Sequence, residues 1–152
     1  MGDEKPPVVV IGVPCRPEDF PRLPQPPELT SDASPLYNCV AWAAGEDYRW
    51  WWPVPGRYWP ADALRQETEA AFERAFELQG YAACDDESLV EGFEKVALYS
   101  SSGSPSHAVR QLPSGAWTSK NGASNDIAVR HPNELAGPIY GSVFRIMVRP
   151  RK

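Results

Sequence analysis

The clearest periodic pattern in the chain is an apolar stripe with helical spacing between Asp62 and Gln79. Its apolar members recur every three or four residues, and they are Leu64, Ala71, Phe72, Ala75, Phe76 and Leu78, with Thr68 in register. Acidic residues occupy the other side, as on a helix with one buried and one wet face. Gly80 follows in a position that favours a helix end. The pattern predicts an amphipathic helix over about 62–79.

A shorter apolar segment, 39–44, has helix signals at both of its ends. Asn38 is a good N-cap type, and Gly45 is a suitable stop. Ser34–Pro35 offers a rival start, because proline is favoured at the first helical position. The segment predicts a short helix that begins at Cys39.

From Phe93 onwards the apolar period shortens towards two, which is typical of strands. The expected strands are 95–99, 106–112, 116–120 and 139–149, with a polar loop at 100–105, a hairpin turn at 113–115 and one helical turn at 131–135. Helices first and antiparallel strands afterwards indicate an α+β fold, in which the two N-terminal helices pack on a C-terminal antiparallel sheet.

The first part of the chain reads differently. The β-branched run 8–13 predicts a strand or an extended segment, and seven prolines follow within 14–35. We therefore expect a single domain over 1–152, in which 1–35 is a proline-rich extended arm.

Composition narrows the partners and the compartment. The net charge is −5, so the chain lacks the basic surface that nucleic-acid binding needs. No apolar run is long enough to span a bilayer, and the acidic start does not resemble a signal peptide. These observations predict a cytoplasmic protein with no membrane or nucleic-acid partner.

Cysteine usage bears on cofactors. Cys15, Cys39 and Cys84 are odd in number, widely spaced and without a CxxC pair. This pattern favours free thiols in a reducing compartment over a disulfide framework, and it contains no recognisable metal-ligand spacing. We expect no metal and no cofactor.

Cys39 is the candidate nucleophile. A thiol at a helix N-terminus lies near unpaired N–H groups and the positive end of the helix dipole, a setting that lowers a cysteine pKa. Hydrolysis through a thiol also needs a histidine within hydrogen-bond reach. The chain has two histidines, and His107 opens the predicted hairpin whereas His131 precedes a proline in a loop.

Three segments resemble an uncharacterised bacterial family, a domain of unknown function. They are YNCVAWA (37–43), GFEKVALY (92–99) and HAVRQLPSGAWTSK (107–120). This resemblance runs from about Tyr37 to the C-terminus and implies no known activity.

A cysteine at a helix start followed by a histidine on a hairpin also distantly resembles the papain-like NlpC/P60 and CHAP-type peptidases and amidases. That resemblance implies a papain-like fold, with Cys39 as nucleophile, His107 as base and a third polar residue on the next strand. Thr118, Ser119 and Lys120 are in range there, and the register decides which faces His107. Asn121, Asn125 and Asp126 come from the following loop, and Asp126 is our candidate because a carboxylate best stabilises an imidazolium.

Two functions remain open from the sequence. The first is a cysteine-dependent hydrolase or acyltransferase that cleaves an amide, peptide or ester bond, with catalytic Cys39, His107 and Asp126. The second is a non-catalytic module of the same fold that binds a peptide or protein. In either case we expect Asn38, Trp42, Trp51 and Ser119 to contact the bound molecule, since the aromatic loop 48–60 offers stacking surfaces.

Overall fold

The structure is a computed structural model of the chain. It describes residues 20–23, 34, 36–120 and 126–151, together with the backbone of 9–10, 13–14 and 28–29; at Asp126 the description covers the backbone alone. The prediction for 14–35 falls largely outside the described residues, and the predicted domain boundary at 35 stays a prediction.

The described elements form one large sheet, one small strand pair and three helical segments. In chain order they are β1 (Val9–Val10), β2 (Val13–Pro14), β3 (Glu28–Leu29), α1 (Cys39–Ala44), α2 (Glu69–Glu77), β4 (Ala82–Cys84), β5 (Phe93–Ser101), β6 (Ser104–Gln111), β7 (Trp117–Lys120), β8 (Asp126–Val129), the 3-10 helix η1 (Pro132–Leu135) and β9 (Ser142–Pro150). The large sheet is antiparallel with the order β3-β8-β7-β6-β5-β9-β4, and β1 pairs with β2.

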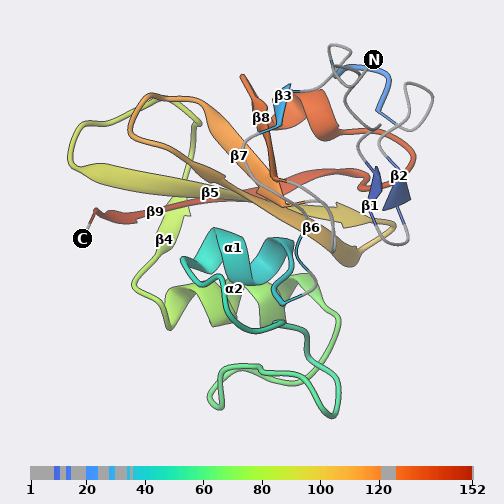
Figure 1. Cartoon of the computed structure of the whole chain (residues 1–152). Helices are drawn as coiled ribbons and strands as arrows, with labels where there is room; N and C mark the ends of the chain where they lie inside the picture. Colours follow the sequence, from blue (N-terminus) through green and yellow to red (C-terminus); the bar gives the residue numbers. More distant parts are fainter. Residues whose placement is uncertain are drawn as a thin grey trace.

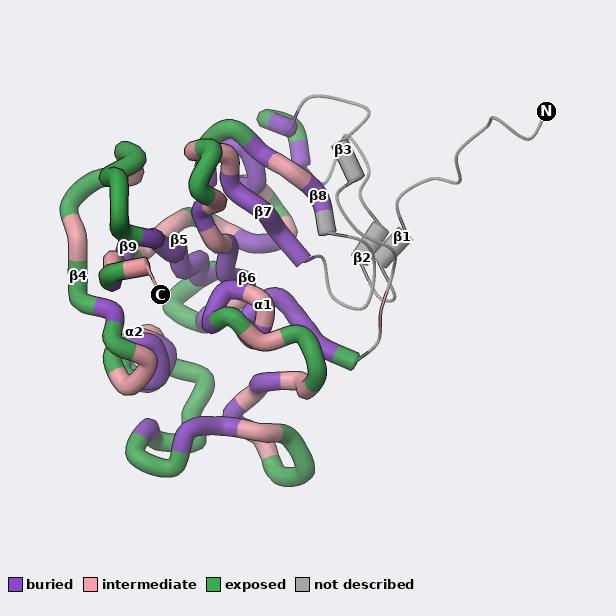
Figure 2. The backbone as a smooth tube through the Cα atoms, turned by 60° about the vertical axis from the view of Figure 1, so that its left-hand side comes forward, coloured by how far each residue is buried: buried purple, intermediate pink, exposed green. Residues whose placement is uncertain are grey.

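Both helices lie on one face of the sheet (Figure 1). Helix α1 contacts β6 and β7, and α2 contacts β6 and β9. Strand β5 alternates between the two faces: Val96 and Leu98 belong to the core under the helices, whereas Ala97 and Tyr99 belong to a second core on the opposite face. Figure 2 shows the burial of β7, of the middle of β5 and of most of β6. The predicted α+β class is confirmed.

Helix α1 has the predicted ends. The Asn38 side chain accepts a hydrogen bond from the Ala41 N–H at 3.2 Å, and Gly45 closes the helix with a φ of 98°. The left-handed region favours glycine, so the sequence sets this stop. The rival start at Ser34 is wrong.

The predicted helix 62–79 is wrong at its start, whereas Gly80 ends it as predicted, with a φ of 95° and its N–H on the Glu77 carbonyl. Helix α2 begins after Thr68, whose side chain accepts a hydrogen bond from the Ala71 N–H at 3.2 Å. Leu64 is 66% exposed, and its carbonyl accepts a hydrogen bond from the Trp59 indole. The contact from Trp59 therefore helps to hold the residues before Thr68 in turns, although their spacing is helical.

The strands also differ from the prediction at several ends. The expected loop 100–105 is wrong, because β5 and β6 continue to a two-residue turn at Ser102–Gly103. Strand β9 starts at Ser142 and not at Ile139, and β4 and β8 are too short to carry a clear pattern. The hairpin of β6 and β7 and the helical turn at 132–135 are confirmed.

Candidate functional site

A hollow of about 290 Å³ lies at the start of α1. The loop after α1, the beginning of β6 and the loop before β9 close its other sides. Its lining residues are Asn38, Cys39, Trp50, Trp52, Ser106, His107 and Tyr140. The two residues with the predicted catalytic chemistry, Cys39 and His107, thus share one hollow.

Asn38 fixes the position of Cys39. Its Oδ1 accepts hydrogen bonds from the N–H groups of Ala41 and Trp51, at 3.2 and 3.1 Å, and its Nδ2 donates to the Trp51 carbonyl at 2.8 Å. One side chain therefore caps α1 and ties the aromatic loop to it. Trp51 itself is buried, and its indole donates to Glu46.

The Cys39 thiol is buried, and this changes the expected chemistry. Burial raises its pKa to about 11, because a thiolate loses solvation there. The backbone N–H groups of Ala108 and Val40 and the charge of Lys120 lower the pKa, but by less than burial raises it. The expectation of a lowered pKa is therefore wrong: a six-residue helix supplies too little to offset the lost solvation.

His107 is also buried, and its Nε2 lies 2.7 Å from the Ser119 hydroxyl. Burial lowers the pKa of His107 to about 3, since an imidazolium is poorly solvated there. The ring is neutral at physiological pH. Neither the thiol nor the imidazole donates a hydrogen bond to the other among the described contacts.

The register of β6 and β7 explains why Ser119 meets His107. Thr118 pairs with Arg110, and its hydroxyl accepts a hydrogen bond from the Trp42 indole, so Thr118 faces α1. Neighbouring residues of a strand face opposite sides, which puts Ser119 and His107 together on the face opposite α1. His107 shares space with Cys39 only in the hollow at the start of α1. The register thus selects Ser119 from the three candidates on this strand.

The side chains of the three candidates for the third catalytic residue that follow β7 lie outside the described residues. The backbone of Asp126 pairs with that of Lys120 across β7 and β8, and its side chain lies outside the described residues. Asn121 and Asn125 also lie outside them. The role of Asp126 stays a prediction.

Tyr140 is the functional candidate that the sequence did not indicate. Its ring stacks on the His107 imidazole, with centroids 3.7 Å apart and planes 2° from parallel. Its carbonyl accepts a hydrogen bond from the Ser106 hydroxyl. Gly137 and Gly141 bracket its loop and exchange two backbone hydrogen bonds, and this glycine spacing was the one available signal.

The aromatic loop reaches the hollow through Trp50 and Trp52, while Trp51 points into the core. Alternation along an extended segment explains the split, because side chains two apart share a side. The Arg110 guanidinium lies over the Trp42 ring, with its Cζ 4.0 Å from the ring centroid. Trp42 does not line the hollow. Of the four expected contact residues, Asn38 lines the hollow and Ser119 reaches it through His107.

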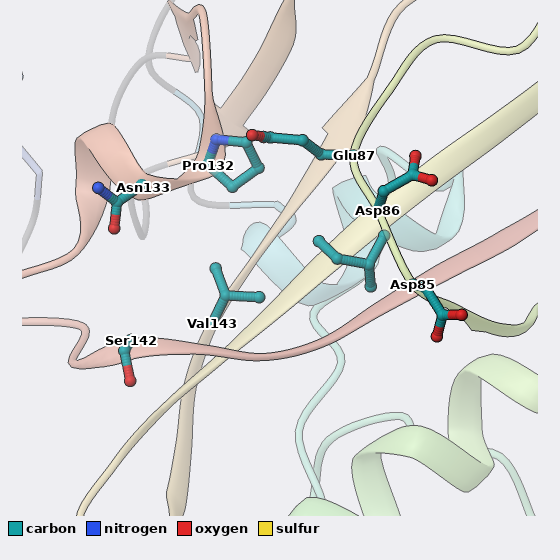
Figure 3. Close-up of a pocket in the computed structure, with 8 residues that line it drawn as sticks. Asp85, Asp86, Glu87, Pro132, Asn133, Ser142 and Val143 are labelled. Atoms are coloured by element: carbon teal, nitrogen blue, oxygen red, sulfur yellow. The ribbon is translucent and has the colours of Figure 1, made fainter.

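A second hollow, of about 440 Å³, has a different lining (Figure 3). Asp85, Asp86 and Glu87 form one side, and Glu87 extends towards Pro132 across it. The floor includes Val143. His131 Nδ1 lies 3.6 Å from Glu87 Oε1 outside the core.

Within the described residues, no three His, Cys, Asp or Glu side chains are grouped so as to hold a metal ion. In the same part of the chain, no helix combines the length and apolarity required to cross a membrane.

Comparison with known proteins gives one match. The model of a family described as a domain of unknown function (DUF7689) matches residues 28–148. No curated protein and no solved structure matches the chain.

Proposed function

The chain belongs to the DUF7689 family, a domain of unknown function, and we propose that it is a cysteine-dependent hydrolase or acyltransferase acting on an amide, peptide or ester bond. Cys39 is the nucleophile, His107 the base and Ser119 the residue that orients the base. The observation that carries this proposal is that Cys39 and His107 line one hollow while Ser119 holds His107 Nε2.

The order of these groups supports the papain-like part of the proposal. A helix start carries the thiol, a strand carries the imidazole, and the next strand carries the polar residue that binds it. This is the arrangement of nucleophile, base and orienting group that thiol hydrolases need. Here a serine fills the third role.

The neutral resting state determines how the first step proceeds. In the tautomer that this role requires, Nε2–H donates to Ser119 and Nδ1 accepts the thiol proton. The Cys39 sulfur bonds to the carbonyl carbon as its proton moves to His107, so no free thiolate accumulates beforehand. The backbone N–H of Cys39 is our candidate donor to the oxyanion.

The later steps return the site to its starting state. Collapse of the tetrahedral intermediate breaks the bond to the leaving alcohol or amine, and His107 protonates that group. Water or another acceptor then attacks the acyl group on Cys39, and the thiol is regenerated.

Hydrolysis of 4-nitrophenyl phenylacetate tests this function. Cys39→Ser should reduce kcat/KM by at least about a thousandfold, as for other enzymes that lose their nucleophile. Cys84→Ser is the matched control and should retain the wild-type value. Equal rates for wild type and Cys39→Ser would refute the proposal.

A second candidate, a non-catalytic module that binds a peptide or protein, is favoured by one observation. Both Cys39 and His107 are neutral and make no hydrogen bond to each other. For this function the phenylacetyl ester should bind and protect Cys39 from alkylation without being cleaved. Turnover that depends on Cys39 would exclude it.

A further inference from the structure

Aromatic rings dominate the lining of the Cys39 hollow. Trp50, Trp52 and Tyr140 contribute three rings, and the remaining lining residues carry an amide, a thiol, a hydroxyl and a neutral imidazole. None of the lining residues is charged at neutral pH. A group that enters this hollow therefore meets apolar ring faces.

The polar side chains of the lining already have partners. Asn38 uses both its Oδ1 and its Nδ2 within the protein, and the Ser106 hydroxyl donates to the Tyr140 carbonyl. A charged group placed here would lose its hydration and find no charged partner among the lining residues, which is strongly unfavourable. The charge of Lys120 reaches Cys39 from outside the lining, and its ammonium already donates to the Ser34 carbonyl. An uncharged group avoids this loss.

The aromatic walls are built into the fold. The Trp52 N–H donates to the Tyr58 carbonyl at 3.0 Å, and the Trp52 ring meets Phe72 edge-on at 5.2 Å. The Trp50 carbonyl accepts a hydrogen bond from the Tyr58 N–H at 3.2 Å. Walls fixed in this way select by shape, because binding does not have to order them.

The size of the hollow limits the group further. A volume of about 290 Å³ corresponds to roughly ten water molecules at about 30 Å³ each. This is the lower end of the range for small-molecule sites, which starts at about 300 Å³. One ring with a short linker fits such a space, whereas several peptide residues do not.

We infer that the Cys39 hollow takes an uncharged aromatic acyl group, with its ring between Trp50, Trp52 and Tyr140 and its carbonyl at the Cys39 sulfur. The inference rests on the proposed acyl-transfer function and names the substrate class of that site. Trp50 is the specificity-determining residue that can be tested, because it is half-buried and belongs to neither described core cluster.

Three 4-nitrophenyl esters provide the test: phenylacetate, acetate and succinate, the last with a free carboxylate. For each, kcat/KM is measured and the acyl adduct on Cys39 is located by peptide mapping. The ester of phenylacetate should react at least tenfold faster than acetate and at least a hundredfold faster than succinate, after correction for spontaneous hydrolysis. Succinate reacting as fast as phenylacetate would overturn the inference and leave the proposed function standing. Failure of all three esters to acylate Cys39 would instead refute the function itself.

A variant pair shows whether the hollow produces this preference. Trp50→Leu should lower the ratio of phenylacetate to acetate at least fivefold. Tyr48→Leu is the matched control, since Tyr48 is an exposed aromatic residue of the same loop that does not line the hollow. An unchanged ratio in Trp50→Leu, or an equal loss in both variants, would contradict the assignment.

Discussion

Two hollows of this molecule each lie beside a cysteine and a histidine, and the surroundings give these residues different properties. In the first, Cys39 and His107 are buried among aromatic rings. In the second, Cys84 is half-exposed and donates to the Asp86 carbonyl, while His131 lies beside Glu87. The cysteine and the histidine at the first hollow are thus neutral and buried. Those at the second hollow are at least partly exposed to solvent and lie next to acidic residues.

The difference shows that the surroundings of a side chain, more than its residue type, determine its charge state. Burial raises the pKa of Cys39 to about 11 and lowers that of His107 to about 3, which keeps both neutral. In the second hollow, the hydroxyl of Ser88 and the ammonium of Lys95 lower the pKa of Asp86 to about 2, which keeps that group charged. For this reason we expect the first site to accept uncharged molecules.

The largest expected effect comes from the residue that separates the two hollows. Gly141 lies between Tyr140 of the first and Ser142 of the second, at a φ of 73°. A Cβ there would be 2.0 Å from the Ser100 carbonyl oxygen. Gly141→Ala should lower the free energy of unfolding by about 3–5 kcal/mol, since backbone strain and a backbone clash add.

Gly56→Ala is the matched control for Gly141→Ala. Gly56 also has a positive φ, 88°, but a Cβ there would have no atom within 4 Å. It should cost about 1–2 kcal/mol, from strain alone. Urea unfolding measures both, and equal losses would show that the loop of Tyr140 is not held by this close contact.

The second-largest expected effect is a difference between the alkylation rates of Cys39 and Cys84. A pKa of about 11 is two units above the ordinary 9.0, so below pH 9 Cys39 has about a hundredfold less thiolate than an ordinary cysteine. Iodoacetamide at pH 7.5 should therefore alkylate Cys84 much faster than Cys39, as measured by peptide mapping. In urea the two rates should converge. Faster labelling of Cys39 in the folded protein would contradict the assignment of a neutral, buried thiol.

Removing the hydroxyl that holds His107 should have an intermediate effect on catalysis. Ser119→Ala leaves a buried ring nitrogen without its partner, which costs about 1–3 kcal/mol and corresponds to roughly a 5- to 150-fold loss in kcat. Ser88→Ala removes an exposed hydroxyl at the second hollow and should leave kcat unchanged. Ser119→Thr, which keeps the hydroxyl, should recover part of the activity. Full activity in Ser119→Ala would exclude an orienting role.

The smallest expected effect is the contribution of His107 to the pH dependence of the free energy of unfolding. An unfolded histidine titrates near 6.5, whereas His107 in the folded protein titrates near 3. Between these values the unfolded state binds a proton that the folded state does not, so stability falls as the pH drops, by about 1.4 kcal/mol per unit. From pH 6.5 to pH 5, His107 should contribute a loss of about 2 kcal/mol.

Urea unfolding at pH 7 and pH 5 checks this contribution. His107→Gln should show a smaller loss of stability than the wild type over this range, by about 2 kcal/mol. His131→Gln is the matched control, because this histidine side chain is 64% exposed. Identical pH dependence in all three proteins would show that His107 is not buried as a neutral ring.

Local signals in the sequence were sufficient for the parts of the fold that depend on neighbouring residues. Asn38 and Gly45 set the ends of α1, and the β6–β7 hairpin follows from alternation. The start of α2 had a local signal in Thr68, an N-cap type whose side chain accepts from the Ala71 N–H, but the apolar spacing continued upstream of it to Leu64. Helical spacing before Thr68 was therefore misleading.

The sequence indicated the two candidate reactive residues, which line one hollow, but not their surroundings. Cys39 and His107 stand out by residue type and position. Ser119 could not be chosen over its neighbours, since a shift of one residue in register reverses the face of a strand. Tyr140 approaches His107 from a loop more than thirty residues away, and the raised pKa of Cys39 depends on burial by the whole fold.

The most direct test of the account is a comparison of two reagents on the same two thiols. Peptide mapping after brief exposure to 4-nitrophenyl phenylacetate at pH 7.5 should find the acyl group on Cys39 and not on Cys84, the reverse of the order for iodoacetamide. His107→Gln should abolish the acylation of Cys39 and leave the alkylation of Cys84 unchanged. Acylation that follows the same order as alkylation, with Cys84 ahead of Cys39, would contradict the claim that the buried pair is an acyl-transfer site.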